Sequence, residues 1–312
     1  MRPLTAAAAT AGALGAGAAA AAHIWARHVE IHRYTLREVE LRILPPGART
    51  RRVLHISDIH LMPRQPHKLA FLEHLATLNP HLVIDTGDNI ASAASVPILA
   101  EALAPLLARP GAFVLGSNDL FAPHPKNPAR YLLPDPRPAG ITEPRDPTLP
   151  TGELVRRLTE FGWKDLTNTR ASIELGGLEV RLVGVDDPHL ERDEMPPRPD
   201  PEPPAPEHGN VLRVAVAHAP YRRVLDAFAA DGADLMLAGH THGGQLRLPG
   251  IGALVTNCDL PRRQARGAST WKGVPLNVSA GMGASPYSDY RLLTPPEATL
   301  LTLRAPRPLA HP

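Results

Sequence analysis

The sequence contains almost no cysteine and few aromatic residues. Its single cysteine is Cys258, so no disulfide can form within the chain and a zinc site built from several thiolates is excluded. Phe, Tyr and Trp together make up 4% of the 312 residues. Basic patches with interleaved aromatic residues, which are typical of nucleic-acid-binding surfaces, are not visible.

The sequence also lacks an excess of charge of either sign. There are 33 Lys and Arg residues against 31 Asp and Glu residues, which leaves a formal net charge of +2. A chain so balanced produces no strong field that would attract nucleic acid. With 43% hydrophobic residues, the chain is long enough to bury one large core. We therefore expect one catalytic-sized globular domain with an N-terminal attachment, and no nucleic-acid partner.

Long runs of strongly apolar residues are missing as well, and the nearest approach is the Ala/Gly-rich segment 5–22. Its length is near the lower limit for a membrane-spanning helix, but alanine and glycine are only weakly apolar. Ala18 and Ala20 fit the A-x-A pattern of a signal-peptide cleavage site. A signal peptide, a membrane anchor and an Ala-rich helix all stay open. We expect membrane association through this segment, or export, on either side of the membrane.

Beyond this segment, short aliphatic stretches alternate with helical ones. Residues 28–45 alternate apolar and charged positions, which predicts an edge strand. Further strands are expected at 53–57, 81–86, 112–115, 211–217 and 235–238, and helices at 68–78, 96–108 and 221–230. This alternation predicts α/β layering. The proline-dense stretches 123–150 and 187–206 are expected to form surface loops.

Each of the five expected strands between residues 53 and 238 is followed by residues that can bind a metal. In chain order these residues are Asp58, His60, Asp88, Asn118, His218, His240 and His242. Ligands of open α/β sheets bind beyond the carboxyl ends of the strands, where these side chains fall. Oxygen and nitrogen donors without sulfur suit Mn, Fe, Zn or Co. A carboxylate between the two sets, that of Asp88, could bridge two ions at a spacing suited to displacement at phosphorus.

The order of these motifs resembles the calcineurin-like metallophosphoesterase superfamily over roughly residues 50–305. SDIHL, DDPH, GHTHGGQ and GMGASPYSDYR are similar to its branch of bacterial membrane-associated phosphoesterases, the YkuE/YaeI-like branch. The resemblance implies an α/β fold, an αββα sandwich of two mixed sheets flanked by helices. The chain then divides into a signal or anchor segment (1–27), an edge strand and linker (28–49), a metallophosphoesterase domain (50–305) and a C-terminal tail (306–312).

The resemblance also implies two divalent metal ions and a phosphoester substrate. One ion would be held by Asp58, His60, Asp88 and His242, and the other by Asp88, His218, His240 and an amide. The implied reaction is hydrolysis of a phosphodiester or pyrophosphate, in a small-molecule or lipid-linked substrate, by a metal-activated water. A phosphomonoesterase, a metal-bearing scaffold without turnover and a site with one metal ion remain alternatives.

The chain departs from the family pattern in two places. The usual G-N-H-D/E segment reads Gly116-Ser117-Asn118-Asp119, so the amide ligand is either replaced by Ser117 or shifted by one residue to Asn118. We favour Asn118 because an amide oxygen is a better donor than a neutral hydroxyl. The catalytic histidine is then missing, its position is taken by Asn118, and His124 and His189 are candidate replacements. The segment 89–92 also lacks the second acid of G-D-x-x-D, which predicts weaker support for the ligands.

Overall fold

Two six-stranded sheets lie face to face in the computed structural model, which describes residues 2–125, 146–205 and 210–307. The first sheet has the order β1-β14-β2-β3-β4-β5. Its strands are β1 (Thr35–Leu41), β2 (Arg51–Ile56), β3 (Leu82–Asp85), β4 (Gly111–Phe113), β5 (Lys164–Asp165) and β14 (Glu297–Leu303). β2 to β5 run parallel, whereas β14 is antiparallel to β2 and parallel to β1.

The second sheet has the order β12-β13-β9-β8-β7-β6. Its strands are β6 (Thr169–Glu174), β7 (Glu179–Gly184), β8 (Val211–Ala217), β9 (Leu235–Ala238), β12 (Gly267–Trp271) and β13 (Val274–Val278). The inner strands β7, β8, β9 and β13 are parallel, and both outer pairs are antiparallel. A separate two-stranded hairpin is formed by β10 (Arg247–Leu248) and β11 (Gly252–Ala253).

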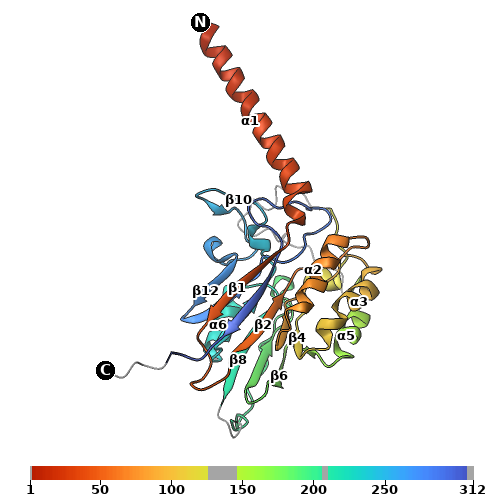
Figure 1. The fold of residues 1–312 in the computed structure, drawn as a ribbon, viewed down its shortest axis with the longest axis vertical. Coiled ribbons are helices and arrows are strands. Elements are labelled where there is room, and N and C mark those ends of the chain that lie inside the picture. The colour runs from red at the N-terminus through yellow and green to blue at the C-terminus, as the bar shows by residue number, and fades with distance from the viewer. Residues whose placement is uncertain (1, 126–145, 206–209, 308–312) are drawn as a thin grey trace, which may run out of the picture.

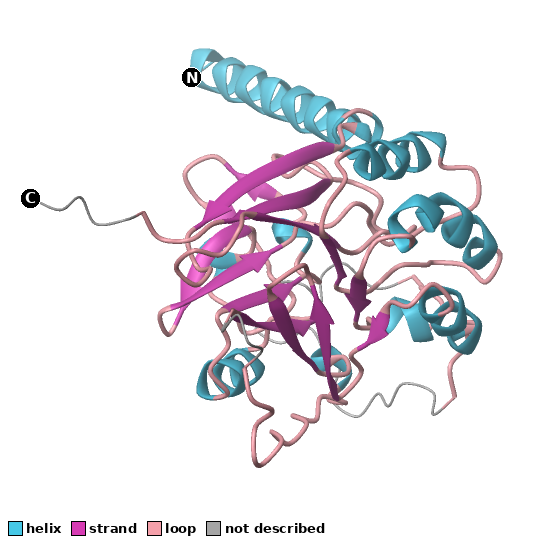
Figure 2. Ribbon diagram, turned by 60° about the horizontal axis from the view of Figure 1, so that its bottom comes forward, coloured by secondary structure: helices cyan, strands magenta, loops and turns pink. Residues whose placement is uncertain are grey.

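Helices cover the outer face of each sheet (Figure 2). The helices are α1 (Arg2–His28), α2 (Pro66–Thr77), α3 (Ser95–Leu107), α4 (Ser117–Leu120), α5 (Thr151–Thr159) and α6 (Arg222–Ala230), with short 3₁₀ turns η1 (Glu30–His32), η3 (Pro188–Leu190), η4 (His242–Gly244) and η5 (Arg262–Gln264). Helices α2, α3 and α5 share one apolar cluster with the first sheet, and α6 shares another with the second. The predicted αββα sandwich is confirmed.

Alternation of side chains along the strands produces these layers. In β8, Leu212, Val214 and Val216 enter the core between the sheets, whereas Ala215 and Ala217 face the layer of α6. Successive residues of a strand point to opposite faces, so a strand buried on both sides is apolar almost throughout. The five strands expected from aliphatic runs are all present, as are the three expected helices. Helix α2 begins two residues early, at Pro66, because proline fits the first turn.

The N-terminal segment is one continuous helix, α1, which extends away from the sheets (Figure 1). Among the described residues, no helix combines the length and the hydrophobicity needed to cross a membrane. Downstream of α1, the alternating segment forms β1 at the edge of the first sheet, over Thr35–Leu41 only. Residues 126–145 and 206 of the proline-dense stretches lie outside the described residues, as does the C-terminal tail from residue 308.

Candidate metal centre

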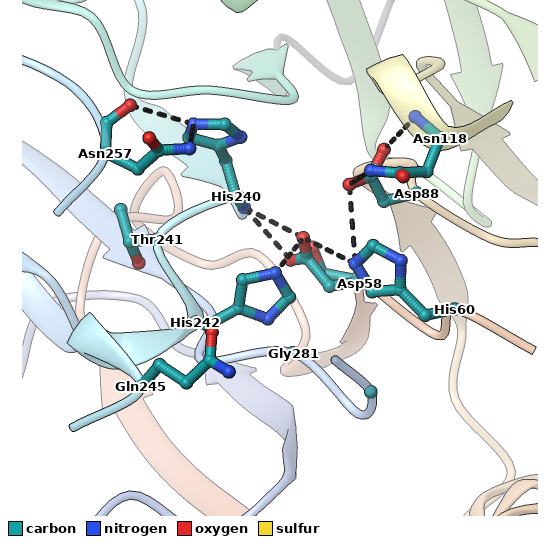
Figure 3. Close-up of polar contacts among 12 residues, drawn as sticks. Asp58, His60, Asp88, Asn118, His240, Thr241, His242, Gln245, Asn257 and Gly281 are labelled. Atoms are coloured by element: carbon teal, nitrogen blue, oxygen red, sulfur yellow. Dashed lines mark hydrogen bonds and ion pairs between the residues drawn. The ribbon is translucent and has the colours of Figure 1, made fainter. Parts of the chain in front are cut away.

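The predicted ligands lie together where the carboxyl ends of strands from both sheets meet, and Figure 3 labels six of them, all but His218. Asp58 and His60 follow β2, Asp88 follows β3, and Asn118 lies in α4 after β4. From the second sheet, His218 follows β8, and His240 and His242 follow β9. His60 Nε2 lies 3.4 Å from Asp88 Oδ2, His218 Nε2 lies 3.6 Å from the same oxygen, and His242 Nε2 lies 3.8 Å from Asp58 Oδ1.

The backbone of five of these residues is left-handed. The φ angles are 48° for Asp58, 43° for His60, 57° for Asp88, 67° for His240 and 48° for His242. Residues other than glycine adopt this conformation rarely, at a cost on the order of 1 kcal/mol or more each. Hydrogen bonds between the turns hold it, such as Asp58 N to Gly87 O at 2.8 Å and His60 N to Asp88 O at 2.9 Å. The local strain therefore serves to direct the side chains into one space.

The glycines of the motifs are needed because the ligands come so close to the backbone. A Cβ atom at Gly116 would lie 2.3 Å from Asp88 Oδ1, and one at Gly239 would lie 1.9 Å from Ser57 Oγ. Real Cβ atoms do not approach other heavy atoms so closely, so any larger residue would displace the carboxylates. The main-chain N–H of His240 then donates to both oxygens of Asp58, at 3.2 and 3.0 Å.

Two overlapping groups of side chains are spaced to hold a metal ion. One contains Asp58, His60 and His242, and the other contains Asp58, Asp88 and His218; within each group the ligand atoms lie within 4.8 Å of one another. The first group contains three of the four ligands expected for one ion. The second contains Asp88 and His218 of the other expected set, with Asp58 in place of His240.

Ring nitrogens that lack a hydrogen-bond partner within the cluster are also consistent with a metal site. His60 is 2% exposed, and neither of its ring nitrogens has a hydrogen-bond partner among the described residues. Buried polar atoms are nearly always paired, so an imidazole of this kind is explained when it binds a cation. His240 joins the same space, since its Nδ1 lies 3.3 Å from His218 Nε2.

Main-chain carbonyl groups orient two of the imidazoles. His218 Nδ1 donates to the carbonyl oxygen of Thr86 at 2.7 Å, which turns its Nε2 toward Asp88. His240 Nε2 lies 3.0 Å from the carbonyl oxygen of Asn257, so it donates there and its Nδ1 faces His218. Histidine ligands of metal sites are typically fixed in this way by a hydrogen bond from the nitrogen that does not bind the ion.

The electrostatics of the cluster favour a bound cation. Burial lowers the pKa of His60 to about 4 and lowers the pKa values of His240 and His242 well below the ordinary value, so these imidazoles are neutral. Burial also depresses the pKa of His218, but Asp88, Asp187 and Asp58 outweigh it and raise that pKa to about 10. A proton on His218 thus offsets the carboxylates, a role that a divalent ion fills more completely.

Asn118, and not Ser117, contacts Asp88. Its backbone N–H donates to Asp88 Oδ1 at 2.7 Å, and its side-chain amide donates to Oδ2 at 2.8 Å. The hydroxyl of Ser117 accepts only from the amide of Asn118, at 3.4 Å. Rotation of the amide by half a turn would present its oxygen in place of its nitrogen. Of Ser117 and Asn118, the two residues considered as the amide-position ligand, Asn118 therefore has its side chain beside Asp88.

Asp119 holds the main chain around Asp88 and Gly116. Its carboxylate accepts from the backbone N–H groups of Asp88 at 2.8 Å, Asn89 at 2.7 Å and Gly116 at 3.0 Å. It therefore ties the turn after β3 to the turn after β4. Asp119 thus braces the two turns that carry Asp88 and Asn118.

Of the two candidate replacements for the missing histidine, His189 lies beside the cluster. Its ring centroid is 4.6 Å from that of His240, and its Nδ1 lies 3.0 Å from the hydroxyl of Tyr221. The buried carboxylate of Asp187 accepts from the backbone N–H of His189 at 2.8 Å and fixes the turn. His124 is exposed, and no contact found among the described residues connects it to the cluster.

Two buried cations near the site were not expected from the sequence. Arg291 is fully buried, donates to the carbonyl of Gly283, and has its Nη2 3.3 Å from His242 Nδ1. Lys68 is 2% exposed and donates to the carbonyls of Ile59 and His60. Arg291 belongs to the quoted motif GMGASPYSDYR, so the sequence held a signal for it. Lys68 begins the expected helix 68–78 and gave no such signal.

Comparison with known proteins gives matches of three kinds. A family model described as calcineurin-like phosphoesterase matches residues 51–244. Phosphodiesterase YaeI from Escherichia coli K12 is 34% identical over 102 residues, which cover 33% of this chain and only 36% of that protein.

Two solved structures also match at 14% identity. TT1561 of Thermus thermophilus has a TM-score of 0.37, with 75% of this chain and 91% of that chain covered. The phosphopantetheinyl hydrolase PptH from Mycobacterium tuberculosis has a TM-score of 0.38, with 78% and 95% covered.

Proposed function

This chain belongs to the calcineurin-like phosphoesterase family, and on that premise we propose that it hydrolyses phosphoesters with the help of two divalent cations. One observation carries the proposal: five of the seven expected ligands, from two sheets, form two groups spaced to hold an ion, and the ring nitrogens of His60 have no hydrogen-bond partner among the described residues. A cluster of acids and imidazoles at strand ends is costly to bury without an ion. A bound cation would offset the cost of burying this cluster.

Asp58, His60, Asp88 and His242 would hold one cation, and Asp88, His218, His240 and Asn118 would hold the other, so Asp88 would contribute to both sites. This set of oxygen and nitrogen donors suits Mn, Fe, Zn or Co. When bound, such ions lower the pKa of water and offset the charge of a phosphoryl group.

The chain's own residues supply orientation and a proton. Asn118 is held at Asp88 by its backbone N–H and by its side chain, so its amide has a fixed position. We assign His189 to protonate the leaving oxygen, since its ring packs against His240 and its Nδ1 contacts Tyr221. A positioned imidazole commonly serves as a general acid. Asp119 is a positioning residue, because it acts through the backbone of Asp88.

The proposed substrate is a phosphodiester or a pyrophosphate, in a small molecule or linked to a lipid. The name of the E. coli relative, a phosphodiesterase, supports the diester. A metal-bearing scaffold is the second candidate, because Asn118 stands where the family has its catalytic histidine. An amide has no proton to give at neutral pH, so the scaffold would require that His189 does not replace it.

The test is hydrolysis of bis-p-nitrophenyl phosphate and p-nitrophenyl phosphate by the full chain loaded with Mn²⁺. The Asp88→Asn variant serves as control, since asparagine also tolerates the left-handed backbone at this position. Turnover of the diester that disappears in the control supports the proposal. Turnover of the monoester alone would make the protein a phosphomonoesterase. Two bound ions per chain without turnover of either ester would establish the scaffold.

A further inference from the structure

The exposed apolar side chains gather at one end of the molecule. Among the described residues, eight large apolar side chains are exposed, and seven of them lie on the foot of α1, on the β10–β11 hairpin and on the segment that precedes β14. These seven are Ile24, Trp25, Val29, Leu248, Ile251, Tyr287 and Leu293, and Ile251 is 65% exposed. The eighth, Phe161, lies after α5.

Hydrogen bonds join these three segments into one surface. The N–H of Arg291 donates to the carbonyl of Ala26 in α1 at 3.0 Å. Leu292 pairs with Leu246 at the base of the hairpin, and the N–H of Arg247 donates to the carbonyl of Leu292 at 3.0 Å. Figure 1 shows the β10 hairpin and the foot of α1 at the same end. We call this end, with its seven apolar side chains, the apical surface.

A basic cavity of about 370 Å³ borders the apical surface, because Arg27, Pro286 and Asp289, from two of the segments that form this surface, line it. It lies between the foot of α1, the segment 62–68 and the segment 282–289, and its lining includes Arg27, His32, Arg64, His67 and Lys68 beside Tyr34 and Met62. Asp289 is the one acid in its lining, and it is paired with Arg27 at 3.2 Å. The cavity therefore holds more positive than negative charge.

The cavity adjoins the proposed metal centre. Lys68, in its wall, donates to the carbonyl of His60, and Gly283, also in its wall, accepts from Arg291. Burial lowers the pKa of His32, and the neighbouring His67, His28 and Lys68 lower it further. An anion in the cavity would offset this repulsion and favour the protonated form of His32.

We propose that the apical surface binds an anionic lipid bilayer, with the apolar side chains in the headgroup region and a lipid phosphate in the basic cavity. Apolar side chains flanked by basic residues are the pattern of proteins that lie on membranes, and basic groups are attracted to anionic lipid. A second copy of the chain fits less well. In a two-fold dimer the basic cavities would face each other and repel. This inference does not require the proposed function.

The experiment is cosedimentation of the full chain with vesicles of phosphatidylcholine, alone or mixed with phosphatidylglycerol. We expect binding to the mixed vesicles that weakens as salt is added, because salt screens exposed charges. The double variant Leu248→Asp/Ile251→Asp should bind at least tenfold less, since its aspartates oppose both insertion and anionic lipid. Arg64→Glu/His67→Glu should bind mixed vesicles no better than phosphatidylcholine alone.

The matched control is Phe161→Asp, which changes an equally exposed side chain outside the apical surface. It should bind vesicles as the unchanged chain does. All variants should keep their melting temperature and their hydrolysis of the soluble diester, because the altered side chains are exposed. Vesicle binding that the hairpin variant retains in full would overturn the proposal and assign binding to α1 alone. A dimer in solution that the hairpin variant dissociates, without vesicle binding, would identify a second copy as the partner instead.

Discussion

The core between the sheets and the proposed metal centre are formed by the same strands, yet they follow opposite rules. In the core, Leu82 and Leu237 are at most 1% exposed, lie in extended strands and belong to one cluster of apolar side chains. In the metal centre, Asp58 and His60 are equally buried, but their backbones are left-handed and their side chains are polar.

This contrast shows how stability and function are divided within the fold. Apolar burial in the core contributes roughly 25 cal/mol per Å² and stabilises the strands. A few residues beyond the ends of these strands, in the proposed metal centre, the backbone is strained and charged side chains are buried. Such local violations are expected at functional sites, where the surrounding structure holds them in place. The core should therefore determine stability, and the metal centre should determine activity.

The largest effect on the proposed metal centre is expected from Asp88→Asn. We expect kcat for the diester to fall by on the order of 10³-fold or more, because one carboxylate contributes to both proposed ion sites. In the presence of a chelator the melting temperature should fall, since burial is outweighed by His218, His60 and the hydrogen bonds from Asn118, which hold the pKa of Asp88 below its ordinary value and make its charge stabilising at neutral pH. A variant that keeps its activity within tenfold would remove Asp88 from the proposed role.

The converse change is Leu237→Ala in the core. We expect the free energy of unfolding to fall by about 2–5 kcal/mol, because a buried cavity replaces the lost side chain. Chemical denaturation of the chelator-treated protein measures this loss. Below the unfolding transition, kcat and the metal content should not change. A large drop in kcat without loss of stability would show that the core and the metal centre are not separable.

A smaller effect is expected for His189→Gln. Loss of a general acid typically costs on the order of 10²-fold in rate, so kcat should fall by that amount while metal binding persists. The basic limb of the pH–rate profile should also flatten, which a purely structural role would not cause. Tyr221→Phe, which removes only the hydroxyl at His189 Nδ1, is the milder comparison. An unchanged pH profile in His189→Gln would assign the proton to another donor.

The smallest expected effect is a release of protons on metal binding. The pKa of His218 is raised to about 10 without a metal ion, so this imidazole is protonated at pH 7.5 and must lose its proton to become a ligand. About one proton per chain should be released, measured by titration calorimetry in two buffers of different ionisation enthalpy.

Affinity for the metal should fall in acid. Burial raises the pKa of Asp58 to about 6, so this carboxylate takes up a proton as the pH falls through that value and then competes with the ion. Affinity that does not change between pH 7.5 and pH 5 would contradict these assignments.

Much of the fold and the location of the ligands could be predicted from the sequence, because both follow local patterns. Aliphatic runs that end on Asp58, Asp88 or His240 identify a strand and its carboxyl end at once. Parallel pairing of β2, β3 and β4 in the first sheet, and of β8 and β9 in the second, brings the carboxyl ends within each sheet to one edge. Gly116 and Gly239 are required by the close approach of the Asp88 and Asp58 carboxylates, and Gly87 by its left-handed φ of 87° and the backbone of Gly116 beside it.

Contacts between distant parts of the chain could not be predicted in this way. The position of His189 next to His240 depends on the packing of two separate loops, and no spacing in the sequence encodes it. The parallel pairing of β1 with β14 likewise joins segments at opposite ends of the chain. The role of Asp119 could not be predicted either, because its three N–H partners lie after two different strands, β3 and β4.

The most direct test of the proposed pair of metal sites is the metal content of the full chain. It is measured by inductively coupled plasma mass spectrometry after loading with Mn²⁺ and removal of free metal. The account predicts two ions per chain, and at most one in Asp88→Asn at the same protein concentration. One ion or none in the unchanged chain would contradict the proposed pair of sites.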